Sequence, residues 1–148
     1  MKPQILVPYD FSPASAKALA WAADLQQSLG DLPVHVIHVV DPLPVTAPEM
    51  LLAVLSERDL KEIGEALSRA VRECKIAATT EVILAPASGH VIVDVARRRN
   101  VDLIAMGTHG RGGLSRLVLG SVAEFVVRHA PCPVVTVRAE PADAAQAA

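Results

Sequence analysis

The sequence predicts an α/β fold, a single three-layer domain in which a five-stranded parallel sheet carries helices on both faces. Three observations predict it. Five short segments rich in β-branched residues alternate with four longer segments of helical periodicity. This alternation favours crossover connections and therefore parallel strands. The 148 residues are enough for one domain with a sizeable core, and 51% of them are apolar.

The first helix lies between the first two predicted strands. Residues 5–7 are a short apolar run, and residues 34–40 are rich in β-branched side chains, so both segments read as strands. Between them, Ser12 can cap free backbone amides and Pro13 suits the first helical position. The helix that they open ends at Gly30.

A proline-rich connection over residues 41–48 can continue neither a strand nor a helix. We expect the next helix to extend from Glu49 to about Cys74. Residues 79–84 then form the third strand. The periodicity of the helix predicts a buried stripe of six side chains: Leu52, Leu55, Leu60, Ile63, Leu67 and Val71.

The remaining elements repeat the alternation. A turn at residues 86–89 leads into a helix over 90–99, and residues 101–106 form the fourth strand. A helix that ends at about His129 and a fifth strand at 133–137 follow. Ligands of such folds bind beyond the carboxyl ends of the strands, where the strand order reverses.

Composition and charge narrow the classes of function. A formal net charge of −2 and an aromatic content of 3% do not support binding to nucleic acid. No apolar stretch approaches the ~20 residues of a membrane span, and no signal-peptide pattern is present, so we expect a soluble, cytoplasmic protein. Two cysteines, Cys74 and Cys132, are too few for a disulfide or metal framework. His35 and His38 face opposite sides of their strand and predict no metal site.

The segment after the fourth strand carries the strongest functional signal. Gly107 and Gly110 follow the strand, nine residues intervene, and Gly120 and Ser121 precede a helix. Glycine lets the backbone approach an anion closely, and free amides at a helix N-terminus attract negative charge. The whole pattern predicts a site for a phosphate chain, whereas a glycine pair alone would indicate an ordinary flexible loop.

Several side chains around this segment are candidates for the site. Ser121 and Glu124 match an S-x-x-E capping box, which predicts that Ser121 caps the helix. His109 and Arg111 can contact phosphate or simply face solvent. Asp10, after the first strand, can accept hydrogen bonds from ribose hydroxyls, or it can form an Asx turn or a helix cap. A carboxylate repels phosphate, although Mg²⁺ can bridge the two.

Catalytic signatures are absent from the sequence. It contains no G-x-S-x-G elbow and no H-E-x-x-H motif, and the glycine segment is neither a Walker A loop nor a G-x-G-x-x-G fingerprint. We therefore assign no catalytic residue, and we favour binding over turnover.

These residues resemble the ATP-binding branch of the universal stress protein family over nearly the whole chain. The most specific portions are Asp102–Gly110, Gly120–Ser121 and Pro131–Val134. The resemblance implies the strand order 3-2-1-4-5 and a nucleotide-binding domain over residues 1–138. Residues 139–148, an alanine-rich stretch with little to bury, are expected to form a flexible tail.

The resemblance also implies an ATP site, and we expect Mg²⁺ to accompany the nucleotide because it can bridge a carboxylate and a phosphate. Asp10 would lie near the ribose, Pro8 would border the nucleoside, and the backbone of Val39 would meet adenine. Met106 and Gly107 would line the pocket. Four further residues would surround the phosphates: Gly110, Gly120, Ser121 and Val122.

Members of this family usually dimerise through the last strand, here Val134, Val135, Thr136 and Val137. An apolar edge strand invites such pairing, although it is also compatible with a monomer. The favoured function is an ATP-binding regulator or adaptor of the stress response. A slow ATPase or phosphotransferase, and an interaction module that binds no nucleotide, are the alternatives.

Overall fold

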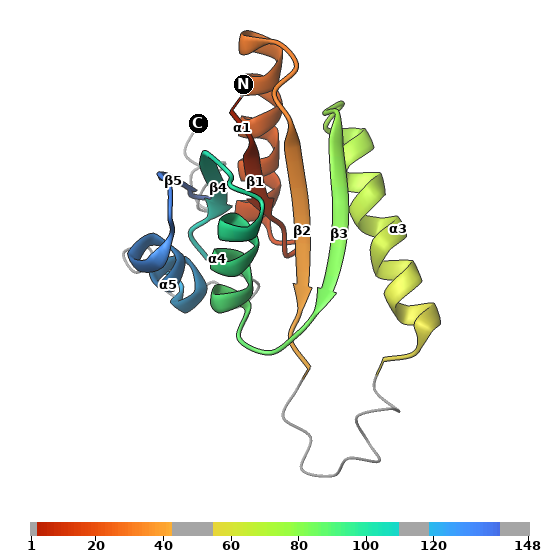
Figure 1. The fold of residues 1–148 in the computed structure, drawn as a ribbon. Helices are drawn as coiled ribbons and strands as arrows, with labels where there is room; N and C mark the ends of the chain where they lie inside the picture. The colour runs from red at the N-terminus through yellow and green to blue at the C-terminus, as the bar shows by residue number, and fades with distance from the viewer. Residues whose placement is uncertain (1–2, 43–54, 110–118, 140–148) are drawn as a thin grey trace, which may run out of the picture.

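The structure, a computed structural model, describes residues 3–42, 55–109 and 119–139 (Figure 1). Within them, one parallel sheet has the strand order β3-β2-β1-β4-β5. The predicted fold class and the strand order implied by the resemblance are therefore confirmed. The strands are β1 (Ile5–Pro8), β2 (Val34–Val40), β3 (Ala78–Leu84), β4 (Leu103–Gly107) and β5 (Val134–Val137).

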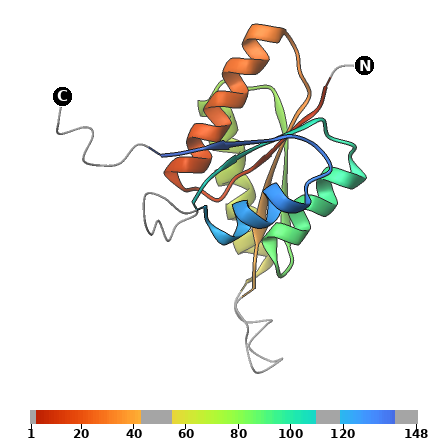
Figure 2. The same ribbon diagram turned by 90° about the vertical axis from the view of Figure 1, so that its left-hand side faces the viewer.

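Helices cover both faces of the sheet (Figure 2). One face packs against α1 and α3, and the other packs against α4 and α5. No helix in the described parts of the chain combines the length and the apolar character needed to cross a bilayer. The helices are α1 (Pro13–Leu29), α3 (Glu57–Glu73), α4 (Ser88–Arg98) and α5 (Ser121–His129).

The central strand β1 shows why the core has two halves. Ile5 and Val7 pack with the side chains of α1 and α3, whereas Leu6, between them, packs with α4 and α5. Successive side chains of a strand point to opposite faces, so a strand covered on both sides must be apolar throughout. All four residues of β1 are buried.

The helix α3 begins at Glu57, because Leu55 and Ser56 are not helical, and residues 49–54 of the predicted helix lie outside the described residues. The Ser56 hydroxyl accepts a hydrogen bond from the Asp59 amide at 3.2 Å, and the Asp59 carboxylate accepts one from the Ser56 amide at 2.7 Å. This reciprocal capping box stabilises a helix start at this point, and we had not recognised it because Asp replaces the usual Glu or Gln. The Ser56 hydroxyl also donates to the Asp59 carboxylate at 2.7 Å, and this bond, followed by the one from the Ser56 amide, lowers the pKa of Asp59.

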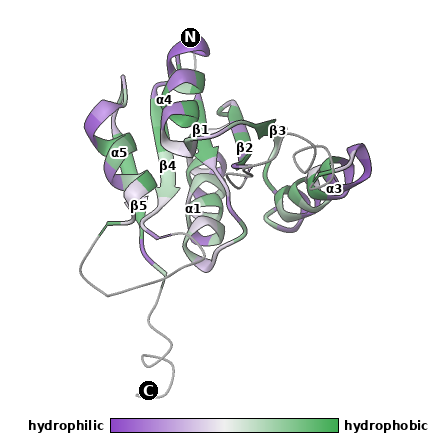
Figure 3. Cartoon of the chain, turned by 90° about the horizontal axis from the view of Figure 1, so that it is seen from below, coloured by the Kyte–Doolittle hydropathy of each residue, from purple (hydrophilic) through white to green (hydrophobic). Residues whose placement is uncertain are grey.

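The predicted stripe of α3 is buried only in the second half of the helix. Leu67 and Val71 are buried against the sheet, whereas Leu60 and Ile63 are half-buried. Leu55 precedes the helix, and Leu52 lies outside the described residues. In Figure 3 the side of α3 that faces away from the sheet is hydrophilic.

The two end strands of the sheet differ in their surroundings. β5 pairs only with β4, and β3 pairs only with β2, within the described residues. α3 runs alongside β3 at that edge of the sheet (Figure 1). The sheet therefore presents two strand edges, at opposite ends of the strand order, to whatever lies beside it.

Candidate functional site

A cavity of about 490 Å³ lies at the carboxyl ends of β1, β2 and β4, where the strand order reverses. Ligands bind at this place in open α/β sheets. The structure brings nine of the predicted site residues together around it: Pro8, Asp10, Val39, Met106, Gly107, His109, Gly120, Ser121 and Val122. Two other predicted residues, Gly110 and Arg111, lie outside the described residues.

Three helices contribute their first turns to the wall of the cavity. Ser12 and Ser15 come from the start of α1, Ser88 from the start of α4, and Ser121 from the start of α5. The Ser12 hydroxyl caps α1, whereas no side chain caps α4 or α5. Free N–H groups and the positive ends of helix dipoles favour an anion in this cavity.

Two residues with a left-handed backbone conformation lie at the starts of two of these helices. Phe11, before α1, has φ 64°, and Ala87, before α4, has φ 61°. A left-handed conformation at a residue with a side chain costs roughly 1 kcal/mol or more, and such strain persists where the surrounding structure requires it. Phe11 precedes Ser12, the N-cap residue of α1, and Ala87 is itself the N-cap residue of α4, so both strained residues lie beside the candidate site.

The capping box predicted for Ser121 and Glu124 at the start of α5 is not formed. Gly120 is the N-cap residue, Ser121 is the first helical residue, and the Ser121 hydroxyl does not cap the helix. The Gly120 amide donates to the Thr108 carbonyl at 2.7 Å, so the chain is already held against the β4 end when the helix begins. Glu124 forms an ion pair with Arg128 at 2.9 Å, one turn further along the helix.

Thr108 is buried and links three parts of the molecule. Its amide donates to the Val137 carbonyl of β5 at 2.9 Å, and its carbonyl accepts from Gly120, at the start of α5. Its hydroxyl lies 3.0 Å from Nδ1 of His109. Sequence reasoning had not selected Thr108, because a threonine between glycines carries no motif of its own.

The glycines serve close packing as well as space for a ligand. A Cβ atom at Gly107 would lie 2.8 Å from backbone atoms of Ala14 and Ser15, at the start of α1. A Cβ atom at Gly120 would lie 3.0 Å from the Thr108 carbonyl oxygen. The sequence pattern alone indicates that both glycines allow the approach of phosphate. Gly107 is required by the contact between α1 and β4, whatever the ligand.

Asp10 forms the Asx turn that was one of its predicted roles. Its Oδ1 atom accepts a hydrogen bond from the Ser12 amide at 3.0 Å, which holds the cap of α1 in place. Asp10 also lines the cavity. Asp10 therefore stabilises the start of α1 and also lies at the cavity, where a contact with ribose is expected.

His109 has one engaged and one unengaged ring nitrogen. Nδ1 lies next to the Thr108 hydroxyl, whereas Nε2 is buried and has no hydrogen-bond partner among the residues that the structure describes. The His109 carbonyl accepts a hydrogen bond from the Ser12 hydroxyl at 3.4 Å. A buried polar atom without a partner is rare in folded proteins, so a ligand atom that could pair with it would be favoured here.

The serine on α4 was not predicted as a site residue. Ser88 follows β3, which is not adjacent to the reversal of strand order. However, the amide of Ala85 donates to Val40 and that of Ala87 donates to the Asp41 carboxylate, which brings the segment back to the end of β2. The carboxyl ends of parallel strands lie at the same edge of the sheet. Ser88 follows the carboxyl end of β3, and this position was the signal that could have identified it.

Comparison with known proteins identifies the family. The model of the Universal stress protein family matches residues 1–138. This chain belongs to the universal stress protein family. A universal stress protein of Methanocaldococcus jannaschii is 34% identical over 140 residues, which cover 91% of this chain and 81% of that protein.

Solved structures of universal stress proteins share the fold. The UspA protein of Lactobacillus plantarum is 27% identical with a TM-score of 0.79, and the match covers 92% of this chain and 97% of that one. A universal stress protein of Archaeoglobus fulgidus in complex with dAMP is 26% identical with a TM-score of 0.63. That match covers 93% of this chain and 98% of that one.

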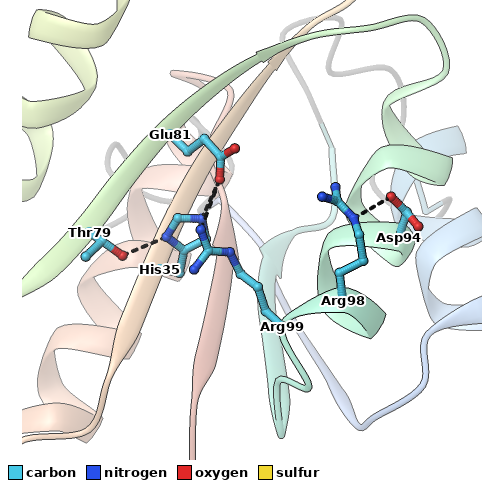
Figure 4. Close-up of polar contacts among 6 residues, drawn as sticks. All are labelled: His35, Thr79, Glu81, Asp94, Arg98 and Arg99. Carbon is cyan, nitrogen blue, oxygen red and sulfur yellow. Dashed lines mark hydrogen bonds and ion pairs between the residues drawn. The ribbon is translucent and has the colours of Figure 1, made fainter.

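A second polar cluster in this universal stress protein lies on the sheet, away from the cavity (Figure 4). His35, whose side chain is 2% exposed, donates from Nε2 to the Glu81 carboxylate at 2.9 Å, and its Nδ1 lies 2.7 Å from the Thr79 hydroxyl. Arg99 lies 3.3 Å from the same carboxylate. The cluster satisfies a buried imidazole and so accounts for His35 structurally.

Acidification is expected to destabilise the fold through this cluster. Burial lowers the pKa of His35 below its ordinary value of 6.5, and the hydrogen bond from His35 lowers the pKa of Glu81 below 4.5. The unfolded chain then binds more protons than the folded one at both groups. The free energy of unfolding should fall as the pH drops below 6.5, and fall further below 4.5.

Urea unfolding between about pH 7.5 and pH 4 measures this dependence. The variant His35→Gln should show a smaller loss of stability than the wild type in the upper part of that range. Equal slopes for the two proteins would assign the pH dependence to other groups.

The two cysteines are free thiols, as predicted. Burial raises the pKa of both the Cys74 and the Cys132 thiol. A raised pKa keeps a thiol protonated at neutral pH, where it is a poor nucleophile.

Proposed function

We propose that this universal stress protein binds ATP, accompanied by Mg²⁺, and acts as a nucleotide-dependent regulator or adaptor of the stress response. The observation that carries the proposal is the cavity itself. It lies at the reversal of strand order, and the uncapped first turns of α4 and α5 face it. Its volume of about 490 Å³ falls in the ordinary range for small-molecule sites.

The cavity has a polar end suited to phosphate. The amides at Ser121 and Val122 open α5, and His109, which also lines the cavity, has a buried Nε2 without a partner among the described residues. In this proposal the α5 amides donate to phosphate oxygens, and Nε2 of His109 becomes the partner of one of them. Gly110 and Arg111 complete this end in the proposal, as the glycine pattern predicts.

The other end of the cavity suits a nucleoside. Ile37 and Val39 of β2 and Ile92 of α4 supply apolar surface for a base. Asp10, held by its Asx turn, would accept hydrogen bonds from ribose hydroxyls. The A. fulgidus structure, which contains dAMP, supports an adenine nucleotide as the ligand class.

Denaturation with and without ATP–Mg²⁺ tests the proposal. A ligand that binds only the folded state at ~100 times its Kd raises the free energy of unfolding by ~2.7 kcal/mol. Mass analysis of nucleotide recovered from the purified protein then identifies the phosphate number. If saturating ATP, ADP and AMP leave the denaturation midpoint unchanged, the proposal is wrong and the protein is an interaction module that binds no nucleotide. Conversion of ATP to ADP by the protein would favour the slow ATPase.

We further propose that the protein dimerises through β5. Among the described residues this strand pairs only with β4, and it consists of Val134, Val135, Thr136 and Val137, none of which is fully buried. An antiparallel contact between two copies of such an edge is self-complementary. Sedimentation equilibrium of the full chain measures the mass, and a monomer at micromolar concentration would contradict the dimer.

A further inference from the structure

A second groove lies at the opposite edge of the molecule from β5, between α3 and the end strand β3. It measures about 600 Å³, and α3 side chains form one wall while β3 forms the other. We call it the α3–β3 groove; its lining includes Lys61, Glu65, Ser68, Arg69, Arg72 and Thr80. None of these residues lines the nucleotide cavity.

The strand that forms one wall has an unpaired edge. β3 is seven residues long and pairs only with β2 within the described residues. The N–H and C=O groups on its outer side therefore form a template for an added strand. All of its residues are exposed or half-buried, including the β-branched Thr79 and Thr80.

The helix that forms the other wall packs against β3. Leu67 and Val71 of α3 are buried on the inner side, and a Cβ atom at Gly64 would meet only Val82, at 3.9 Å. Across the groove the Ser68 and Thr80 hydroxyls approach to 3.4 Å. These contacts hold α3 against β3, and the groove lies between side chains of the two elements that are mostly exposed.

The charges of the groove are unbalanced. Among the described residues, Lys61, Arg69 and Arg72 form no ion pair, whereas Glu81 is already engaged by His35 and Arg99. Three cations therefore face a single uncompensated carboxylate, that of Glu65. A partner that carries several carboxylates is complementary to this surface.

We infer that the α3–β3 groove is a docking site for an acidic, extended peptide segment of a partner protein, which adds to β3 as a sixth strand. Backbone hydrogen bonds to the β3 edge would supply the pairing. Alternate side chains of the peptide would place carboxylates beside Lys61, Arg69 and Arg72. This site does not depend on the nucleotide cavity, so it stands or falls independently of the proposed function.

The experiment uses the full-length protein and a fluorescein-labelled peptide, Thr-Glu-Val-Glu-Val-Glu-Thr, followed by fluorescence anisotropy. The double variant Arg69→Glu/Arg72→Glu should weaken binding roughly tenfold or more, because two attractive charge contacts become repulsive. The matched control Arg58→Glu/Lys75→Glu makes the same change of charge outside the groove and should bind like the wild type.

Two N-methylated peptides test strand addition directly. Alternate N–H groups of a strand point to the same side, so methylation of one alternating set should abolish binding while methylation of the other set should not. Slower hydrogen exchange of β3 amides in the presence of the unmodified peptide would further support the docking site.

Four results would overturn the inference. They are no saturable binding at millimolar peptide, equal weakening by both charge variants, equal binding of both methylated peptides, or equal binding of a peptide with Lys in place of Glu. A change in oligomeric mass caused by Arg69→Glu/Arg72→Glu would instead assign the groove to a contact between two copies of this chain.

Discussion

The substitution Gly107→Val is expected to reduce the free energy of unfolding by about 3 kcal/mol, the upper range for overpacking a close contact. A Cβ atom at this position would lie 2.8 Å from the backbone of α1, at Ala14 and Ser15. Backbone atoms cannot rotate away as a flexible side chain can. The helix would have to shift from β4, against which it makes extensive contact.

Urea denaturation in the absence of nucleotide measures this loss. A matched control is Gly64→Ala, in the middle of α3, where the new Cβ atom has ordinary space. That control should stabilise the protein by about 0.5–1 kcal/mol, because glycine is unfavourable inside a helix. A Gly107→Val protein as stable as the wild type would mean that α1 does not sit closely on β4.

The substitution Ser121→Glu is expected to weaken ATP binding by about 100-fold or more. Ser121 is the first residue of α5 and lines the polar end of the cavity. A carboxylate there would face the phosphates, and two like charges ~4 Å apart repel by about 4 kcal/mol at the effective dielectric of a protein surface. Without nucleotide, the free energy of unfolding should be unchanged or slightly higher, since a negative charge suits a helix N-terminus.

Isothermal titration with ATP–Mg²⁺ measures the affinity, and Ser121→Ala is the control. That variant removes the hydroxyl but retains the α5 amides, so it should alter affinity only a few-fold. Gly120 is a poorer place for such a test, because a side chain there would also press on the Thr108 carbonyl. If Ser121→Glu binds ATP as tightly as the wild type, the phosphates do not bind at the N-terminus of α5.

The sequence predicted the sheet well because covered parallel strands have an unmistakable pattern. Ile5, Leu6 and Val7 are buried on alternate faces, and only a two-sided core requires three consecutive apolar residues in so short a strand. The helix starts were harder. At Ser56 a real capping box went unrecognised, and at Ser121 an apparent one is not formed, because the Thr108 carbonyl holds Gly120 at the cap position.

The candidate site was predicted where residues follow strands, and missed where it depends on contacts between segments distant in sequence. Asp10 and Gly107 come directly after β1 and β4, so their place at the strand ends follows from the topology. Ser88 reaches the cavity through hydrogen bonds between its preceding turn and the end of β2. No local pattern encodes such a contact, nor the packing of Gly107 against α1.

The two backbone hydrogen bonds of Thr108 have a mechanical consequence. Its amide is bonded to the last strand at 2.9 Å, and its carbonyl is bonded to the start of α5 at 2.7 Å. A displacement of Gly120 by more than a few tenths of an ångström must either break the second bond or drag the residue that holds Val137. The last strand and the helix that faces the cavity are therefore coupled through the two hydrogen bonds of Thr108, in addition to the short connection that joins the end of α5 to β5.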